Sequence, residues 1–254
     1  MAKPYGAGPY YDLMLARGRE RIAFLATRLR RFHRLLDVGA GNGELALALA
    51  RRGHEVICLE PSRAMFGVLL ARLPAQGTAA RRITPLCRSI GSRLSLRVDA
   101  AYCCNVLHLI RSEAARRRFL RAIFRCLPPG GLLVFDFVPR LAPRTQARNL
   151  LATGRFGAVT YCHWTATRRR RNDYHIVDWT VEGRQGRRLV DRYTESFHVR
   201  SDSAAYWERT VAACGGVVLA QLSGYPGPAQ RVQSGSNRGV ILARKRLQAG
   251  SPPR

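Results

Sequence analysis

The sequence predicts an α/β fold in which one sheet of seven strands carries helices on both faces. A small antiparallel β insertion is expected after strand five. Residues 35–60 read as a buried strand, a glycine turn, a helix and a second buried strand. Apolar runs and helical spacing then alternate to about residue 137, which is typical of a sheet built from crossover units. Residues 158–167 and 174–182 alternate strictly, and a third alternating run contains Tyr193, Phe197 and Val199, which indicates antiparallel strands.

Short apolar runs mark the strands of the sheet, and helical spacing fills the intervals between them. Strands are expected at 35–38, 55–59, 83–86, 99–103, 132–137, 217–223 and 239–244. Helices are expected at about 44–52, 62–73 and 203–214, with Ser62 as an N-cap. One further helix places five apolar residues on one face: Phe119, Leu120, Ile123, Phe124 and Leu127. Its opposite face, Arg117, Arg121 and Arg125, is expected to be solvated.

The expected organisation has five parts: a lead-in at 1–33, a core at 34–138, a β flap at 139–200, the completion of the core at 201–246 and a disordered tail at 247–254. In the lead-in, Ile22, Leu25 and Leu29 share one helix face. The pair Tyr10-Tyr11 before this helix is open to two interpretations, a packing anchor or a lid over a ligand.

Composition narrows the class of protein. The chain has 254 residues with 46% hydrophobic content, enough for a sizeable core. No apolar run approaches the roughly 20 residues that span a bilayer, and the first residues carry no apolar signal core. The seven cysteines form no C-x-x-C pair, which favours buried thiols in a reducing compartment. We therefore expect a cytoplasmic protein with no membrane partner.

The charge is strongly basic. There are 43 basic and 16 acidic residues, giving a formal net charge of +27, and only Lys3 and Lys245 are lysines. This balance favours a polyanionic partner such as RNA, DNA or an acidic carrier protein. A codon bias would explain arginine in place of lysine, but not the shortage of acids. Because the arginines are spread along the chain, weak nonspecific polyanion binding is the expectation.

The glycine turn reads Gly39-x-Gly41-x-Gly43, which differs from the G-x-G-x-x-G of dinucleotide sites. Glu44 then falls in the first turn of the helix, where a carboxylate disfavours a bound phosphate. Glu60 follows the second strand, 17 residues after Gly43. A carboxylate there can accept hydrogen bonds from both ribose hydroxyls. The alternative is an acid that stabilises the N-terminus of the next helix.

Four motifs in this order resemble those of the class I S-adenosylmethionine-dependent methyltransferases, whose fold is Rossmann-like. They are Asp37–Gly43, Glu60–Met65, Asp99–Leu109 and Leu127–Asp136. The resemblance implies S-adenosylmethionine as cofactor. It implies that Asp37 and the turn hold the methionine part, Glu60 the ribose, and Met65 the adenine. Ser89 stands where the family usually has an acid that contacts adenine. The full set implied to bind the cofactor is Asp37, Gly39, Ala40, Gly41, Gly43, Glu60, Pro61, Met65, Ser89, Ile90, Cys104 and Asn105.

A general base would help to remove a proton from the methyl acceptor. His108, just past the fourth strand, is the first candidate and Tyr11 the second. A packing role is the alternative for His108. Three flap histidines could instead line the acceptor pocket: His163, His175 and His198. No pattern of acids suggests a metal site, so none is expected.

The layout is similar to small-molecule N-methyltransferases that act on amino sugars or glycine. The expected function is methyl transfer to nitrogen or oxygen of a small molecule. The alternatives are a methyltransferase acting on RNA, protein or a carrier-bound acyl group, and a non-catalytic module that binds nucleotide or RNA. No Asn/Asp-Pro-Pro-Tyr or Pro-Cys follows the fourth strand, which argues against adenine-N and cytosine-C5 enzymes. The sequence does not indicate the oligomeric state.

Overall fold

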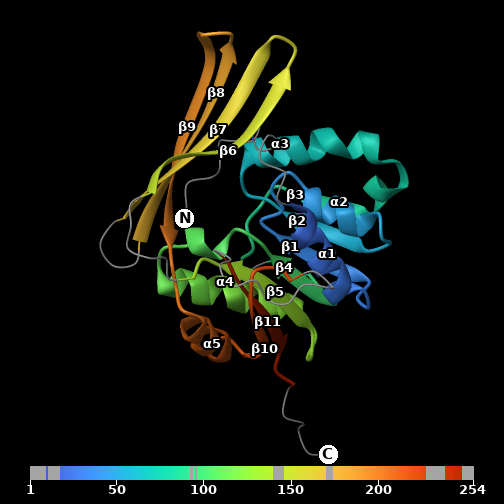
Figure 1. Ribbon diagram of the computed structural model, residues 1–254. Coiled ribbons are helices and arrows are strands. Elements are labelled where there is room, and N and C mark those ends of the chain that lie inside the picture. The colour runs from blue at the N-terminus through green and yellow to red at the C-terminus, as the bar shows by residue number, and fades with distance from the viewer. Residues whose placement is uncertain are drawn as a thin grey trace, which may run out of the picture.

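The computed structural model describes residues 10, 18–91, 94, 96–139, 146–169, 174–226 and 238–247. The strands of this part of the chain form two sheets (Figure 1). The larger sheet has the order β10-β11-β5-β4-β1-β2-β3, and the smaller has the order β6-β7-β8-β9. The predicted fold class, a seven-stranded sheet with an antiparallel insertion after strand five, is confirmed.

Strands of the larger sheet are β1 Arg34–Val38, β2 Glu55–Leu59, β3 Ile83–Leu86, β4 Ala100–Cys103, β5 Leu132–Phe137, β10 Gly216–Ser223 and β11 Gly239–Lys245. The helices are α1 Gly18–Leu29, α2 Glu44–Ala50, α3 Arg63–Arg72, α4 Glu113–Cys126 and α5 Ala204–Ala213, with 3-10 segments η2 Leu73–Arg82 and η3 Leu107–Leu109. Strands β1 to β5 are mutually parallel, whereas β11 runs antiparallel to both β5 and β10. The carboxyl ends of β1, β2, β4 and β5 therefore meet at one edge.

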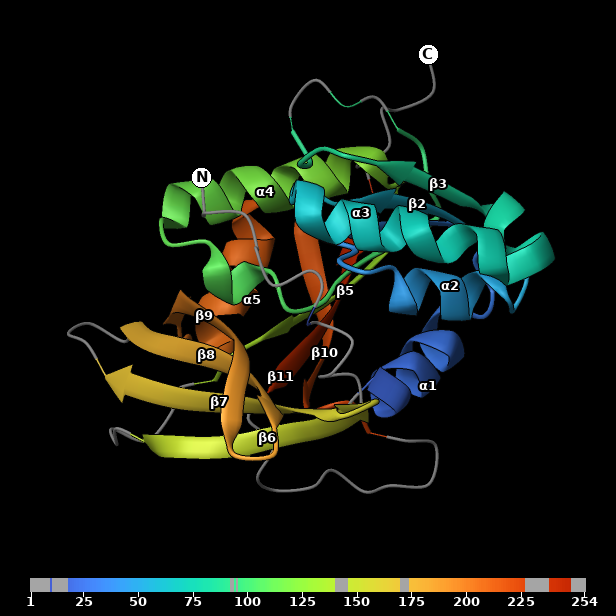
Figure 2. The same ribbon diagram turned by 90° about the horizontal axis from the view of Figure 1, so that it is seen from above.

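Two apolar cores lie on the two faces of the larger sheet. Side chains of α4 and α5 fill one, including Ile123 and Trp207, which are both fully buried. Side chains of α1 and α2 fill the other, including Leu25 and Leu49. Figure 2 shows these two helix layers on opposite sides of the strands. The amphipathic pattern of α4 is confirmed. Arg117, on the predicted basic face, is exposed, whereas Ile123, on the predicted apolar face, is buried.

Serine residues begin three of the helices. The side chains of Ser62, Ser112 and Ser203 each accept a hydrogen bond from the amide three residues later. Such caps satisfy an amide that has no partner within the helix. Ser62 matters most for the site, because it fixes where α3 begins relative to the end of β2.

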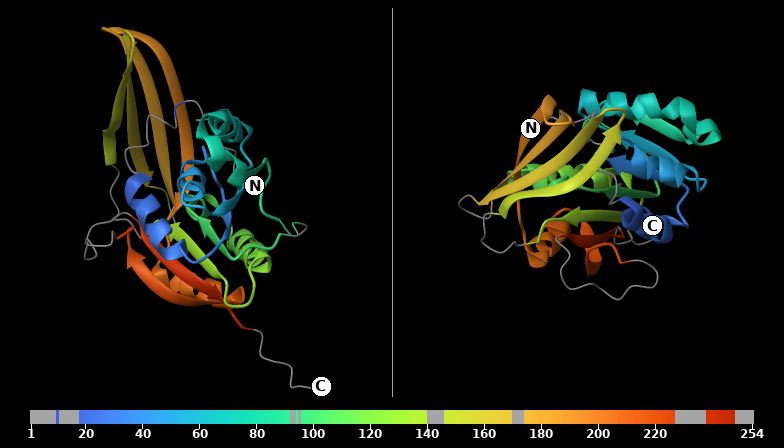
Figure 3. Two further views of the ribbon diagram at one scale, coloured as in Figure 1. Left: turned by 90° about the vertical axis from the view of Figure 1, so that its right-hand side faces the viewer. Right: turned by 45° about the horizontal axis from the view of Figure 1, so that its top comes forward.

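The flap is the smaller sheet, made of β6 Gln146–Phe156, β7 Val159–Arg169, β8 Tyr174–Gln185 and β9 Arg188–Arg200. Strands β7 to β9 correspond to the alternating runs in the sequence, but β6 was not predicted. Its pairing with β7 shifts register twice, so its side chains do not keep a strict period of two. Figure 3 shows the flap extending beyond the helices of the core. Residues 73–82, which connect the helix predicted at 62–73 to the strand predicted at 83–86, form η2 with a kink at Gly77.

No helix among the described residues is long and apolar enough to cross a bilayer.

Candidate cofactor and active site

The glycine turn connects β1 to α2 at the carboxyl edge of the sheet. Gly39, Gly41 and Gly43 all have positive φ, at 81°, 59° and 78°. A Cβ built on Gly39 would lie 2.4 Å from Val106 Cγ2, and one on Gly43 would lie 2.2 Å from Leu69 Cδ1. Both conformation and close packing thus require glycine here. The backbone of the turn can approach a ligand with no side chain in between.

Replacing Gly43 with alanine is expected to destabilise the fold more than replacing Gly53, a matched glycine. Gly53 also has positive φ, at +98°, but a Cβ there would meet nothing within 4 Å. Gly53→Ala should cost about 1–2 kcal/mol from backbone strain alone. Gly43→Ala adds overpacking against Leu69, about 1–3 kcal/mol more. Denaturant unfolding of both variants measures the difference, and equal losses would contradict the packing argument.

Glu60 lies at the end of β2 and braces the glycine turn. Its Oε2 accepts a hydrogen bond from the Gly41 amide at 2.8 Å, and its Oε1 accepts one from the Ser62 amide at 2.7 Å. The side chain is buried, which raises its pKa, while the two amides act in the opposite direction. Each carboxylate oxygen has a second lone pair, so two further donors can still be accepted. The carboxylate thus stabilises the turn and can still accept hydrogen bonds from a diol.

Asp37 is a buried acid at the end of β1. Its Oδ2 has no hydrogen-bond partner within the described residues. Burial raises the pKa of Asp37 to about 7; Glu60 also raises it, and the Tyr102 hydroxyl and Arg21 lower it. The Tyr102 hydroxyl is near enough to affect this pKa but makes no hydrogen bond of normal geometry. A buried carboxylate with an open oxygen is suited to a cationic ligand group.

Asn105 follows β4 in an unusual backbone conformation. Its φ of 60° makes it the non-glycine residue with positive φ in the described part of the chain. The Asn105 amide donates to Asp136 Oδ1 at 2.7 Å, and Tyr225 donates to Asp136 Oδ2 at 2.7 Å. The side-chain Oδ1 of Asn105 is buried and has no hydrogen-bond partner within the described residues. Asp136 and Tyr225 were not predicted as site residues; an acid ending an apolar strand was the signal for Asp136.

The other predicted cofactor residues lie at different depths. Met65 is buried beside the turn, with its Cε 3.3 Å from a Cβ built on Gly41. Ala40, Ile90 and Cys104 are buried, whereas Pro61 and Ser89 are exposed. The Glu60 amide donates to Leu86 O at 3.1 Å, which holds β2 and β3 together just before Ser89. These assignments remain predictions.

His108 is buried in η3, and its ring is already engaged. Arg238 Nη1 lies 3.2 Å from His108 Nδ1. Since a guanidinium can only donate, Nδ1 accepts and the ring proton is on Nε2. Burial, Arg238 and Arg116 together hold the pKa of His108 well below its usual value. The imidazole is therefore neutral, with its lone pair occupied, which does not favour the predicted role as a base.

Tyr11 lies outside the described residues, but its neighbour Tyr10 contacts the flap. The Tyr10 hydroxyl donates to Asp191 Oδ2 at 2.7 Å, and its ring stacks on Tyr193 with centroids 5.3 Å apart. The hydrogen bond to Asp191 is the main cause that raises the pKa of Tyr10 to about 12. His163 and His175 are buried in the flap sheet. In the described residues, no group of three or more His, Cys, Asp or Glu could hold a metal ion.

The start of α2 is not arranged for a phosphate. The Asn42 side chain accepts from the Glu44 amide at 3.2 Å, and Glu44 brings a negative charge to the first turn. An anion would be repelled where a dinucleotide site attracts one. The site thus combines two buried acids with an open glycine turn. This suits a ligand with a diol and positive charge but no phosphate.

Comparison with known proteins agrees with this chemistry. Residues 36–133 match the family model described as a methyltransferase domain. This region is a methyltransferase domain. The matched region begins within β1 and ends within β5, and it contains the turn, Asp37, Glu60 and Asn105.

Three similar proteins extend the comparison. A ubiquinone biosynthesis O-methyltransferase from Alkalilimnicola ehrlichii is 35% identical over 111 residues, 42% of each chain. An S-adenosylmethionine-dependent methyltransferase from Clostridium acetobutylicum has a TM-score of 0.75 at 17% identity, covering 95% of this chain and 98% of that one. An amino pentose methyltransferase from Micromonospora echinaspora, solved with S-adenosylmethionine bound, has a TM-score of 0.73 at 19% identity over 96% and 98%. The chain spans 41–42% of the length of the first curated relatives.

Proposed function

We propose that this protein is an S-adenosylmethionine-dependent methyltransferase whose acceptor is an amine of a small, polar, sugar-like molecule. The observation that supports this cofactor is that two buried acids, Asp37 and Glu60, flank a glycine turn that disfavours phosphate. S-adenosylmethionine has a ribose diol, two positive charges and no phosphate. When bound, it supplies an activated methyl group on a sulfonium.

The residues of the site have separable tasks in this proposal. The turn leaves room for the methionine part, and the open oxygen of Asp37 receives the ammonium group. Glu60 accepts from the ribose hydroxyls with the lone pairs that the Gly41 and Ser62 amides leave available. Met65 lies beside the turn as an apolar contact for the adenine. The chain's remaining task is to align the acceptor and exclude water.

Nitrogen is favoured over oxygen as the accepting atom because of the state of His108. An aliphatic hydroxyl is a very weak acid and needs a base at the moment of transfer. The lone pair of His108 Nδ1 is occupied by Arg238, and burial disfavours a protonated ring. A neutral amine already presents a lone pair and can release its proton after transfer. The described arrangement therefore suits an amine better than a hydroxyl.

The flap supports a small acceptor. Its base packs on the segment after β4, where Leu109 contacts Phe197 and Val199. The flap thus rises from the same edge that carries the turn. The likeness to the amino pentose methyltransferase spans 96% of this chain and so includes the flap as well as the core.

The test is a screen with labelled S-adenosylmethionine against amino sugars, each paired with its hydroxy analogue. We expect label in amino sugars and none in the matched hydroxy compounds. Equal labelling of both would overturn the nitrogen assignment. Failure to bind S-adenosylmethionine in calorimetry would overturn the enzyme assignment and favour a non-catalytic module.

An RNA acceptor is the second candidate, and the net charge of +27 favours it. Arginine contacts to phosphates make affinity fall steeply with salt. We expect RNA affinity to drop by roughly 100-fold or more between 50 and 200 mM salt, as for several phosphate contacts, and no methyl label in the RNA. Filter binding across salt concentrations, with labelled cofactor present, measures both. Methylated RNA at 150 mM salt would favour the second candidate over the first.

A further inference from the structure

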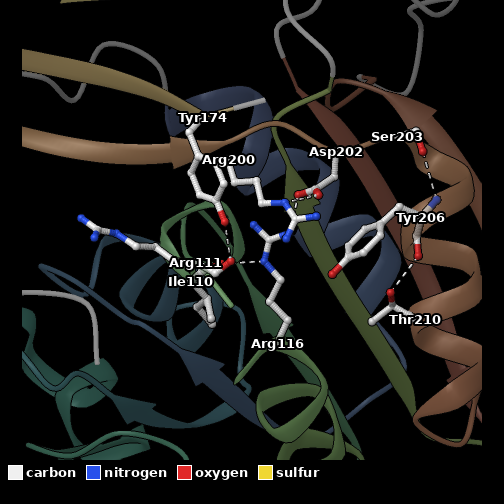
Figure 4. A network of polar contacts seen from close by, with 9 residues as sticks. All are labelled: Ile110, Arg111, Arg116, Tyr174, Arg200, Asp202, Ser203, Tyr206 and Thr210. Carbon is white, nitrogen blue, oxygen red and sulfur yellow. Dashed lines mark hydrogen bonds and ion pairs between the residues drawn. The ribbon is translucent and has the colours of Figure 1, made fainter. Parts of the chain in front are cut away.

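A fully buried arginine joins the core to the flap (Figure 4). Arg116 lies on α4 with no exposed surface. Its Nε donates to the carbonyl of Ile110 at 2.6 Å, and its Nη1 forms an ion pair with Asp202 Oδ2 at 2.5 Å. Ile110 follows η3, the segment that carries His108. One guanidinium thus holds the segment after β4 and the segment after the flap at the same time.

Asp202 is the centre of this arrangement. It lies two residues after β9, at the exit of the flap, and is buried. Its amide donates to the carbonyl of Val138 at 3.0 Å, at the entrance to the flap. Its Oδ1 pairs with Arg200 Nε at 3.0 Å. The two ends of the flap are therefore bonded to each other and, through Arg116, to α4.

A second contact, independent of Arg116, also joins the flap to the segment after η3. The Tyr174 hydroxyl, at the start of β8, donates to the carbonyl of Arg111 at 2.8 Å. The Arg200 guanidinium lies 5.9 Å from the Tyr174 ring centroid and 5.2 Å from that of Tyr206, within cation–π range. Residues 107–111 are thus held by α4 on one side and by the flap on the other. The angle of the flap and the position of this segment are mechanically linked.

The two contacts of Arg116, with the Ile110 carbonyl and with Asp202, require an arginine at this position. A guanidinium is planar and offers several donors in a fixed fork, so it can bond a carbonyl and a carboxylate together. A lysine keeps the charge but presents a compact ammonium that cannot reproduce both bonds in the same geometry. None of these contacts involves the glycine turn, Asp37 or Glu60. A change at Arg116 should therefore reach the flap without reaching the cofactor site.

We propose that Arg116 is a positioning residue for methyl transfer, which fixes the flap over the carboxyl edge so that the acceptor meets the cofactor in one geometry. This inference rests on the proposed function. It assigns to the pair Arg116–Asp202 the alignment of the acceptor, and to Tyr174 a supporting share of the same task. The cofactor is bound independently of all three.

The test compares Arg116→Lys and Tyr174→Phe with Arg117→Lys, the adjacent exposed arginine, whose ion pair is to Glu113 on its own helix. Three quantities are measured: the Kd of S-adenosylhomocysteine by calorimetry, kcat/KM for the best amino sugar of the screen, and hydrogen exchange of residues 107–111. For Arg116→Lys we expect a Kd within twofold of the wild type, kcat/KM lowered at least tenfold, and faster exchange. Tyr174→Phe should change kcat/KM and exchange in the same direction but less. Arg117→Lys should change none of them.

Two outcomes would overturn the inference. If Kd and kcat/KM worsen together in Arg116→Lys, the arginine acts only through general stability. If hydrogen exchange of residues 107–111 is unchanged in Arg116→Lys, Arg116 does not hold this segment in place. Should Arg116→Lys fail to fold, Tyr174→Phe decides, because it removes one hydroxyl at the flap surface. Should the wild type methylate no amino sugar, the proposed acceptor is wrong, while the exchange result still decides whether Arg116 positions the segment.

Discussion

Glu60→Gln is expected to weaken S-adenosylmethionine binding by at least about 100-fold. The glutamine keeps the shape of the side chain, but its amide nitrogen cannot accept from the donors that now surround it. One of the Gly41 and Ser62 amides loses its acceptor, and the ribose loses a charged partner. Hydrogen bonds to charged groups contribute about 1.5–3 kcal/mol each, and about 1.4 kcal/mol is a tenfold change in affinity. Calorimetric titration with the cofactor measures the loss.

The matched control is Glu55→Gln, at the other end of the same strand. Glu55 is exposed and lies at the amino end of β2, away from the glycine turn. This variant should bind the cofactor as the wild type does. If Glu60→Gln also binds like the wild type, the assignment of the site to Glu60 is wrong.

Asp37 should make cofactor binding depend on pH. Burial raises its pKa to about 7, so the acid is largely protonated at pH 6 in the free protein. Binding of a cationic group requires the carboxylate. We expect the affinity for S-adenosylmethionine to rise about tenfold from pH 6 to pH 8, and to level off above the pKa. Asp37→Asn should bind weakly at every pH, and a retained tenfold rise in that variant would assign the dependence to another group.

The same raised pKa predicts an effect on the stability of the free protein. The native state keeps the Asp37 proton up to about pH 7, whereas the unfolded state loses it near the usual value of 3.8. The native state thus binds more protons in this window, and stability falls as pH rises through it. Across pH 4 to 7 the contribution is on the order of 2–4 kcal/mol. Urea unfolding of wild type and Asp37→Asn should show a smaller decline in the variant.

The sequence predicted the sheet well because its strands are short apolar runs between helices with a clear period. The acids Asp37 and Glu60 could be placed at the carboxyl edge for the same reason, since each ends a buried strand. Their roles as cofactor ligands remain predictions. The partners of Glu60, the amides of Gly41 and Ser62, depend on how the turn folds back on β2, which no local pattern records.

Other features depend on tertiary contacts between distant residues. Arg116 is the first of three consecutive arginines on α4, and only its burial against Trp207 and Tyr206 distinguishes it from the two exposed ones that follow. Its partner Asp202 is 86 residues away in sequence. Strand β6 was missed because its register shifts break the alternation on which a prediction depends. Arg238, which occupies the ring of His108, comes 130 residues later.

The hydrogen bond between Val138 and Asp202 has a consequence for how proteins of this architecture can diversify. The chain leaves the core and returns to it at nearly the same point, and β5 pairs with β4 and β11 without the flap taking part. The described residues between Val138 and Asp202 thus form an insertion whose entrance and exit are hydrogen-bonded to each other. Under the proposed function, exchange of that insertion for another of different sequence would alter which molecule is methylated and leave Asp37 and Glu60 unchanged. The arrangement allows modular evolution, in which the same core can carry different insertions.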